Sequence, residues 1–252
     1  MLMQSKKVVI ITGSGRGIGA ETAKLFATNG YRVCINYRSN DISAEALKEE
    51  ILEGGSPCIS VKADVSIGSD VTRLFEVVEL ELGRITALVN NAGILKTQCR
   101  LDEMSEERFS EILRVNIMSC FLCSKEAVKR MSTKHGGLGG VIVNVSSGAS
   151  KSGSPSEYID YAASKGAIDT LTRGLALEVA AEGIRVNAVR PGLIYTEMHA
   201  SGGENNRVDR LKTRIPMQRG GQPKEVAEAI LWLASEKSSF VTGSFIDPAG
   251  GL

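Results

Sequence analysis

The sequence predicts an α/β fold in which helices cover both faces of one open, doubly wound parallel sheet. Short apolar runs of strand length alternate with longer segments of helical pattern along the chain. The first run, residues 8–11, is apolar at every position, as expected of a strand buried on both faces of a parallel sheet. A glycine-rich turn and a helical pattern follow it directly. The chain has 252 residues, 42% of them apolar, which is enough for one core, so we expect a single domain over residues 1–252.

The net charge and hydropathy of the chain limit the classes of binding partner that we expect. Formal net charge is +1, from 30 basic and 29 acidic residues without a basic stripe, which argues against binding to nucleic acid or to a membrane surface. No apolar run approaches a membrane span, and the N-terminus enters a strand without a signal-peptide pattern. We therefore expect a cytoplasmic protein whose five cysteines are reduced thiols.

No metal site is expected. Cys120 and Cys123 form a CxxC pair inside an apolar helical run, where burial as small hydrophobic side chains is favoured over metal or redox chemistry. The two histidines, His135 and His199, lie in loop-like segments without other candidate ligands.

The turn at residues 12–19 is a candidate phosphate site. It joins the strand at 8–11 to a helix expected over residues 20–28. Glycines let a ligand approach the backbone closely, and the free N–H groups of a helix N-terminus attract an anion. A plain tight turn is the alternative, and the absence of any Gly-Lys pair excludes a Walker-type loop. The candidate cofactor-binding residues here are Gly13, Ser14, Arg16, Gly17, Ile18 and Gly19.

The end of the second expected strand, residues 32–37, favours NADP over NAD. In NAD-binding units this position usually carries an acidic residue that binds the ribose hydroxyls. Here Tyr37 and Arg38 follow instead, and no carboxylate appears before Asp41. Arg38, joined by Arg16, can pair with a 2′-phosphate; the alternative is that both arginines are solvated surface charges. Tyr37 and Arg38 are therefore candidate cofactor contacts.

Polar residues also follow the third strand. A helix is expected over residues 43–52 and a strand over 57–62, with Asp64 and Val65 directly after it. A carboxylate at the carboxyl end of a strand lies on the edge where open α/β sheets bind ligands, so Asp64 can accept from an adenine amino group. A turn or N-cap role for the helix expected over 67–82 is equally supported.

Two further segments place polar residues at or within the expected core. The strand at 87–89 ends in Asn-Asn-Ala-Gly, which suits close contact with a ligand or a plain turn; Asn91, Ala92 and Gly93 are candidate cofactor contacts. A long helix is expected over residues 106–131, and Asn116 lies among its apolar residues. Such an amide needs a partner, either as a satisfied core group or beneath an active site.

Tyr161 and Lys165 are four residues apart in a helix expected over 159–180, so both side chains leave the same face. The ammonium favours the phenolate, which predicts a lowered pKa for Tyr161 and an acid–base role; a surface pair is the alternative. Ser147 ends the strand at 140–145, and the following loop can bring its hydroxyl beside the phenol. No GxSxG elbow occurs, which argues against a serine hydrolase.

The last third of the chain holds the predicted substrate-specific part. A strand over 184–189 ends in Pro191 and Gly192. Residues 193–218 are polar and contain glycine, which indicates a substrate lid or a disordered surface loop. A helix is expected from Pro223 to about residue 234, and a final strand over 240–246.

Taken together, these motifs resemble the short-chain dehydrogenase/reductase family over essentially the whole chain. The matching pieces are TGxxxGxG at 12–19, Asp64, NNAG at 90–93, Asn116, Ser147, Tyr161-xxx-Lys165 and Pro191-Gly192. Within that family the chain looks like oxidoreductases grouped with glucose 1-dehydrogenases and 3-oxoacyl-carrier-protein reductases. One departure is Asp-Pro-Ala-Gly-Gly at 247–251, where many relatives have Asp-Gly-Gly.

The resemblance implies a Rossmann-type sheet of seven strands. It also implies hydride transfer between a nicotinamide cofactor and a carbonyl or secondary alcohol; the cofactor is NADP(H), with NAD(H) as the alternative. It implies that Tyr161 is the general acid or base, that Lys165 lowers its pKa and holds the nicotinamide ribose, and that Ser147 binds the substrate oxygen. Asn116 would support a water linking Lys165 to solvent.

The resemblance further implies that Ile194 and Thr196 approach the cofactor, that Tyr161 and Lys165 border it with Pro191 and Gly192, and that the protein is a homotetramer. The alternatives are a sugar dehydrogenase that uses NAD or NADP, and a non-catalytic module that senses the dinucleotide.

Overall fold

The computed structural model describes residues 7–252 and contains one sheet of seven parallel strands. The strand order is β3-β2-β1-β4-β5-β6-β7, so the chain reverses direction across the sheet between β1 and β4. This order confirms the expected seven-stranded Rossmann-type sheet. Ligands bind such sheets outside the carboxyl ends of the strands at the reversal. The strands are β1 Val8–Ile11, β2 Arg32–Tyr37, β3 Cys58–Lys62, β4 Ala87–Asn90, β5 Gly140–Val145, β6 Ile184–Val189 and β7 Phe245–Ile246.

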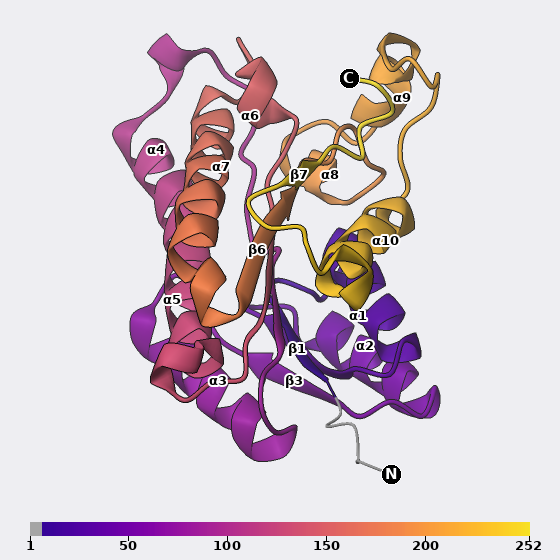
Figure 1. Ribbon diagram of the computed structural model, residues 1–252. Coiled ribbons are helices and arrows are strands. Elements are labelled where there is room, and N and C mark those ends of the chain that lie inside the picture. Colours follow the sequence, from indigo (N-terminus) through magenta and orange to yellow (C-terminus); the bar gives the residue numbers. More distant parts are fainter. Residues whose placement is uncertain (1–6) are drawn as a thin grey trace.

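Helices cover both faces of the sheet, as predicted (Figure 1). Helices α1, α2 and α10 pack on one face, and α3, α5 and α7 pack on the other. The helices are α1 Gly17–Thr28, α2 Asp41–Glu53, α3 Gly68–Glu81, α4 Glu106–Leu113, α5 Ser119–Met131, α6 Ala149–Ser152, α7 Ile159–Val179, α8 Met198–Ser201, α9 Arg207–Leu211 and α10 Pro223–Ala234.

Strand β1 shows why its apolar run is continuous. Val9 and Ile11 belong to the core cluster on the α1–α10 face, and Val8 and Ile10 belong to the cluster on the α3–α5 face. Both faces of the strand are therefore buried and shielded from water. Successive side chains of a strand point to opposite faces, so apolar residues are needed at every position.

The structure corrects three predicted elements, and it moves other boundaries, such as the start of α2, by one or two residues. Helix α1 begins at Gly17 rather than residue 20. The helix expected over 106–131 is interrupted by a π-helical segment, Arg114–Met118, between α4 and α5. The last strand begins at Phe245 rather than residue 240, because Phe240 is fully exposed and the Val241 carbonyl accepts from the side chains of Arg185 and Asn187.

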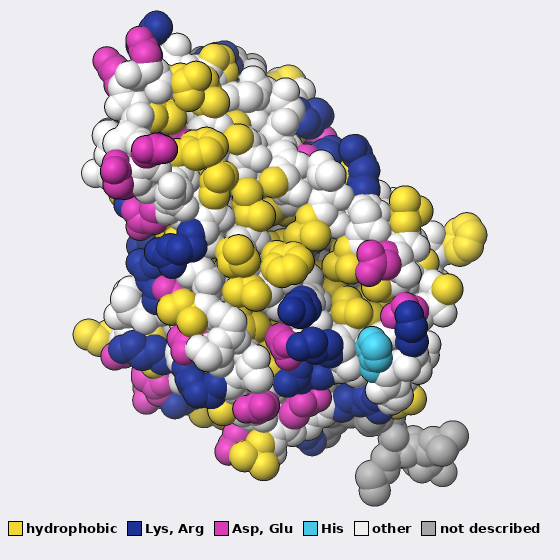
Figure 2. All heavy atoms as spheres, turned by 90° about the vertical axis from the view of Figure 1, so that its left-hand side faces the viewer, with side chains coloured by type: hydrophobic (Ala, Val, Ile, Leu, Met, Phe, Trp, Pro, Cys, Tyr) yellow, Lys and Arg dark blue, Asp and Glu magenta, His cyan; other side chains and the backbone are white. Residues whose placement is uncertain are grey.

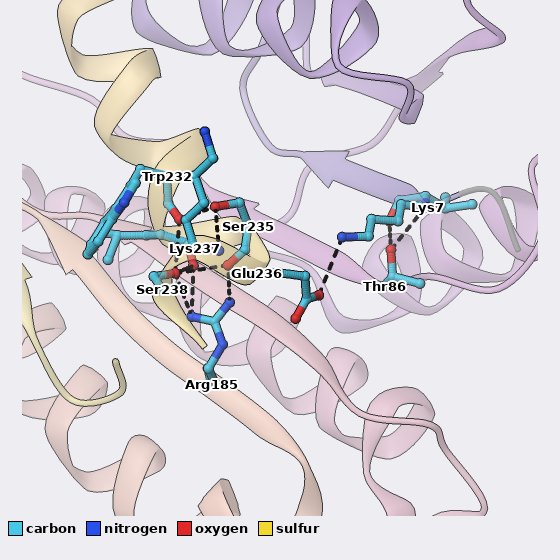
Figure 3. A network of polar contacts seen from close by, with 10 residues as sticks. Lys7, Thr86, Arg185, Trp232, Ser235, Glu236, Lys237 and Ser238 are labelled. Atoms are coloured by element: carbon cyan, nitrogen blue, oxygen red, sulfur yellow. Dashed lines mark hydrogen bonds and ion pairs between the residues drawn. The ribbon is translucent and has the colours of Figure 1, made fainter. Parts of the chain in front are cut away.

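Arg185 of β6 fixes the end of α10 (Figure 3). Its guanidinium donates to the Leu233 carbonyl (2.9 Å), the Ser235 carbonyl (3.0 Å) and the Ser238 hydroxyl (3.0 Å). The carbonyls that end a helix have no partner within it, so this arginine satisfies them and ties α10 to the sheet.

All five cysteines, which lie within the described residues, are free thiols. Cys120 and Cys123 are buried in α5, and burial raises the pKa of Cys120 to about 12 and that of Cys123 well above its usual value. Cys123 packs in the apolar core, as predicted, whereas the buried Cys120 thiol also donates to Oδ1 of Asn144 (3.5 Å). Within residues 7–252, no helix combines the length and the apolarity that crossing a bilayer requires.

Candidate active site

A cavity of about 460 Å³ lies at the carboxyl ends of β1, β2 and β4, where the strand order reverses. Its walls come from the glycine turn, from the ends of β2, β3 and β4, and from the segment after β6. The lining residues are Gly13, Gly15, Arg16, Gly17, Ile18, residues 36–40, 63–66 and 91–95, Val115, Ser119, residues 196–198 and Ser201.

The turn at residues 12–19, called the cradle below, permits no side chain at two of its glycines. A Cβ at Gly13, whose φ is +60°, would lie 2.9 Å from the Cα of Ala92. A Cβ at Gly19 would lie 2.6 Å from Nδ2 of Asn91. That amide donates to the carbonyls of Thr12 (2.9 Å) and Gly13 (2.9 Å), which fixes the cradle against the end of β4. Close backbone packing therefore explains these glycines.

The start of α1 suits an anion. Gly17 and Ile18 border the cavity, and the first turn of this twelve-residue helix has neither a side-chain cap nor an acidic residue. Free N–H groups and the helix dipole there favour negative charge. The start of α1 is therefore a candidate anion site on the cavity wall.

Arg16 and Arg38 are exposed and line the outer part of the cavity. Nη1 of Arg38 lies 4.0 Å from a carboxylate oxygen of Asp64, and Nη1 of Arg114 lies 3.9 Å from the same oxygen. Glu197 also lines the cavity, so its lining side chains carry two positive and two negative charges, and Arg16 and Arg38 also meet solvent.

Asp64 borders the cavity and also shapes the turn before α3. Its Oδ1 accepts from the backbone N–H (3.0 Å) and the hydroxyl (2.6 Å) of Ser66. Burial raises the pKa of Asp64, but the Ser66 hydrogen bonds and the charges of Arg38 and Arg114 outweigh it and hold the pKa below its usual value. The turn role predicted for this carboxylate is therefore observed, and its contact with an adenine stays a prediction.

Tyr161 and Lys165 lie one turn apart in α7, as their spacing predicted. Nζ of Lys165 lies 5.5 Å from the centroid of the Tyr161 ring and donates to the carbonyl of Val145 (2.8 Å). Ser147 follows β5; its hydroxyl accepts from the Ala149 N–H (3.1 Å) and lowers the pKa of the Tyr161 phenol. These three residues and Asn116 are called the tetrad below.

The pKa predicted for Tyr161 is wrong in direction. Burial raises the pKa of the phenol to about 12, and the Ser147 hydroxyl opposes this rise only in part. Burial also lowers the pKa of Lys165 to about 8, against the charges of Cys120 and Asp169. The physical reason is burial: the phenol loses its solvation, and Nζ of Lys165 is bound to the Val145 carbonyl.

Asn116 is fully buried in the π-helical segment, with three hydrogen bonds. Its Oδ1 accepts from the Ile94 N–H (2.8 Å), and its Nδ2 donates to the Ile94 carbonyl (3.1 Å) and the Ser164 hydroxyl (3.0 Å). It is a satisfied core amide that also joins the cavity wall at Ile94 to the helix bearing Tyr161.

Gly93 marks where the cavity meets the tetrad. It lines the cavity, and a Cβ there would lie 3.4 Å from Oδ1 of Asn116 and 3.6 Å from Nζ of Lys165. The four tetrad side chains do not line the cavity themselves, so the two parts of the site adjoin at this glycine.

Four other residues that were predicted to contact the cofactor do not line the cavity. Ser14 is buried and donates to the Ile11 carbonyl, and Gly19 packs against Asn91 and Ser14. The Pro191 carbonyl accepts from the Gly148 N–H (2.9 Å), and Ile194 is buried and paired with Gly221.

Gly192 supports the segment after β6 and is likewise outside the cavity. A Cβ there would lie 2.9 Å from the Cα of Ala249. Ala249 belongs to the unusual Asp-Pro-Ala-Gly-Gly sequence, and Asp247 of the same stretch accepts from Lys151 (3.0 Å). The C-terminal sequence therefore packs beneath this part of the site.

The remaining predicted contacts line the cavity: Gly13, Arg16, Gly17, Ile18, Tyr37, Arg38, Asp64, Val65, Asn91, Ala92, Gly93 and Thr196. Glu197, Met198 and Ser201 also line the cavity and fall within the predicted lid. The lining residues that the sequence did not indicate as cofactor contacts are Gly15, Asn36, Ser39, Asn40, Ala63, Ser66, Ile94, Leu95, Val115 and Ser119. Most of them adjoin predicted contacts in sequence, so adjacency was an available signal.

Comparison with known proteins agrees with this geometry. A family model described as Enoyl-(Acyl carrier protein) reductase matches residues 13–252. The chain is 57% identical to the uncharacterised oxidoreductase YgfF of Escherichia coli, over 97% of this chain and 99% of that protein. It is 36% identical to glucose 1-dehydrogenase 2 of Bacillus subtilis, over 98% and 94% of the two chains. It is 33% identical to the 3-oxoacyl-[acyl-carrier-protein] reductase FabG of Staphylococcus aureus, over 99% of each.

Proposed function

The chain belongs to the short-chain dehydrogenase/reductase family of oxidoreductases, and on that premise we propose that it transfers a hydride between NADP(H) and a carbonyl or secondary alcohol. The observation that carries the proposal is the junction at Gly93. A nucleotide-sized cavity with a glycine cradle ends there, beside the side chains of Lys165 and Asn116. Hydride transfer and proton transfer need such adjoining sites.

The residues around the cavity fit a nicotinamide dinucleotide. The cradle and the start of α1 would hold the diphosphate, Asp64 and Val65 would border the adenine, and residues 91–93 would border the nicotinamide ribose. When bound, the nicotinamide supplies or accepts the hydride at C4. The preference for NADP rests on Arg16 and Arg38, whose guanidinium groups suit a 2′-phosphate.

In this proposal the tetrad handles the proton and the substrate oxygen. Tyr161 gives its phenolic proton to the oxygen in reduction and takes it back in oxidation. Ser147 hydrogen-bonds the same oxygen. The Lys165 ammonium orients the ribose and lowers the cost of forming a phenolate, which matters because burial alone raises the pKa of Tyr161. Asn116 holds the Ile94 wall and the Tyr161 helix together.

Turnover with NADPH and a panel of carbonyl substrates tests the proposal. Tyr161→Phe should lower kcat by at least about 100-fold, since proton transfer loses its donor, and should leave NADPH binding nearly unchanged. Tyr31→Phe, far from the cavity between α1 and β2, is the matched control and should keep normal turnover. Equal turnover of the Tyr161 variant and the wild type would contradict the mechanism.

A fluorescence titration with NADPH and NADH side by side tests the cofactor choice. Tighter NADPH binding would support the roles of Arg16 and Arg38. Equal or tighter NADH binding would favour a sugar dehydrogenase, the second candidate function, which the relative named glucose 1-dehydrogenase 2 supports. A non-catalytic sensor would bind either cofactor and turn over no member of a carbonyl, alcohol and sugar panel.

We also propose that the protein is a single-domain, cytoplasmic homotetramer. Phe109 of α4, Met118 of the π-helical segment and Phe121 of α5 are exposed, and Figure 2 shows apolar side chains gathered across this face. Such a patch is typical of a subunit interface. Phe121→Glu should lower the molar mass measured by light scattering, whereas an unchanged mass would place the interface elsewhere.

A further inference from the structure

One buried arginine holds residues 193–218 against the rest of the chain. Arg207 of α9 is only 8% exposed. Its Nη1 donates to Oε1 of Glu157 (3.0 Å) and to Oε2 of Glu204 (3.2 Å), and its Nη2 pairs with the other oxygen of Glu157. Glu157 lies in the turn just before α7, so this fork joins two segments that are distant in sequence. Paired, charge-assisted contacts of this kind are strong and directional.

Tyr158 completes the contact beneath the arginine. The guanidinium carbon of Arg207 lies 5.1 Å from the centre of the Tyr158 ring, a cation–π distance. The Tyr158 hydroxyl donates to the Gly202 carbonyl (3.2 Å). A Cβ at Gly202 would lie 2.8 Å from Cδ2 of Leu95 and 3.0 Å from that hydroxyl, so the 193–218 backbone rests directly on these side chains.

Glu204 extends the contact to the segment after β4. Its Oε2 accepts from Nε2 of Gln98 (2.9 Å) and from Arg210 (2.9 Å), which reaches it from the exposed side. The Cys99 N–H donates to the Glu157 carbonyl (3.1 Å), which ties the same segment to the turn before α7. Three segments therefore meet at the Arg207 guanidinium.

The same stretch of chain forms one wall of the cavity. Thr196, Glu197 and Met198 line it, as does Ser201 of α8. The Gly202 N–H donates to the Met198 carbonyl (3.0 Å), so the wall and the arginine contact are joined through the backbone of α8.

We propose that Arg207 is a positioning residue that keeps residues 193–218 closed over the cavity and slows release of the bound cofactor. The inference rests on the proposed function, because it takes the ligand of the cavity to be NADP(H). Glu157 retains solvent contact, with 30% of its side chain exposed. Its carboxylate can therefore be rehydrated when the segment opens, which makes the contact reversible in a way that a dry apolar contact is not.

The test compares Arg207→Met with Arg210→Met. Both remove one arginine of α9 that pairs with Glu204, but only Arg207 reaches Glu157. Hydrogen exchange of residues 198–211 in ligand-free protein and NADPH dissociation by stopped-flow fluorescence are measured. Arg207→Met should accelerate both by about tenfold, as expected when one partner of a buried charge pair is removed. Arg210→Met should change either rate less than about twofold, as for an exposed pair.

Glu157→Gln provides the second arm, because it alters the partly exposed side of the same pair and keeps its shape. It should reproduce the effect of Arg207→Met, and the double variant should show less than the sum of the two effects. Equal behaviour of the Arg207 and Arg210 variants, or additive effects in the double variant, would overturn the proposal. Failure of the wild type to bind NADPH would instead overturn the proposed function, and hydrogen exchange in the ligand-free protein would still decide whether Arg207 holds the segment closed.

Discussion

The cradle and the tetrad, which are the two parts of the site, are built from different chemical groups. The cradle is mainly backbone: a Cβ at Gly13 or Gly19 would lie within 3 Å of other atoms, and Arg16 is its one ionisable group. The tetrad is side chain, and its two ionisable members are shifted by burial, Tyr161 upward and Lys165 downward. The cradle should therefore respond to added volume and the tetrad to lost hydrogen bonds and to pH. The following experiments, from the largest expected effect to the smallest, test that contrast.

Gly19→Ala should damage the cradle most. The new methyl would meet Nδ2 of Asn91 at 2.6 Å and the Cα of Ser14 at 2.7 Å, so the turn or the β4 end must move. We expect a loss of about 1–3 kcal/mol in unfolding free energy, measured by urea denaturation, and NADPH binding too weak to titrate.

Gly68→Ala is the control for that experiment, because no atom lies within 4 Å of its Cβ position. It should be neutral or slightly stabilising. If the two alanine variants are equally stable and bind NADPH equally, close packing does not define the cradle.

Asn116→Ala should disturb the tetrad by removing hydrogen bonds that support it. It leaves the N–H and C=O of Ile94 without their side-chain partner, which costs about 1–3 kcal/mol for a buried polar group. Because the amide also joins the wall to the helix of Tyr161, kcat should fall more than NADPH affinity does. Asn205→Ala, at an exposed position, should change neither quantity. A loss of stability with unchanged kcat would make Asn116 purely structural.

The pH dependence of NADPH binding should identify Lys165. Its pKa is about 8, so the ammonium predominates below pH 8 and the neutral amine above it. If the ammonium binds the ribose, affinity should weaken by up to about tenfold between pH 7 and pH 9, the fall in the protonated fraction. Tyr161, with a pKa raised to about 12, does not titrate in this window.

Lys165→Met should bind weakly and without that inflection. An inflection that survives in this variant would assign the titration to another group, and a flat wild-type profile would contradict the proposed contact.

Arg38→Asp should have the smallest effect, because it acts at the exposed rim where neither packing nor burial amplifies it. Loss of one charge-assisted contact, about 1.5 kcal/mol, predicts about a tenfold shift of the NADPH-to-NADH affinity ratio toward NADH. Arg100→Asp, at another exposed position, should leave the ratio unchanged. An unchanged ratio in both variants would mean that Arg38 serves only the ion pair with Asp64.

Much of the fold could be predicted because its signals are local. The apolar run of β1, the glycines of the cradle and the four-residue spacing of Tyr161 and Lys165 each depend on neighbours within one or two turns. The length of the last strand was predicted wrongly. The side chains of Arg185 and Asn187, which are far from β7 in sequence, bind the Val241 carbonyl before it.

By itself, the sequence determined the parallel sheet, its helical layers and the order of the motifs along the chain, since hydrophobic period and glycine placement constrain each segment separately. Only the tertiary structure decided the pKa direction of Tyr161, the π-helical turn at Asn116 and the contact of Arg207 with Glu157. These depend on burial and on groups brought together from distant segments. Desolvation and long-range pairing act through distances in space that no local pattern encodes.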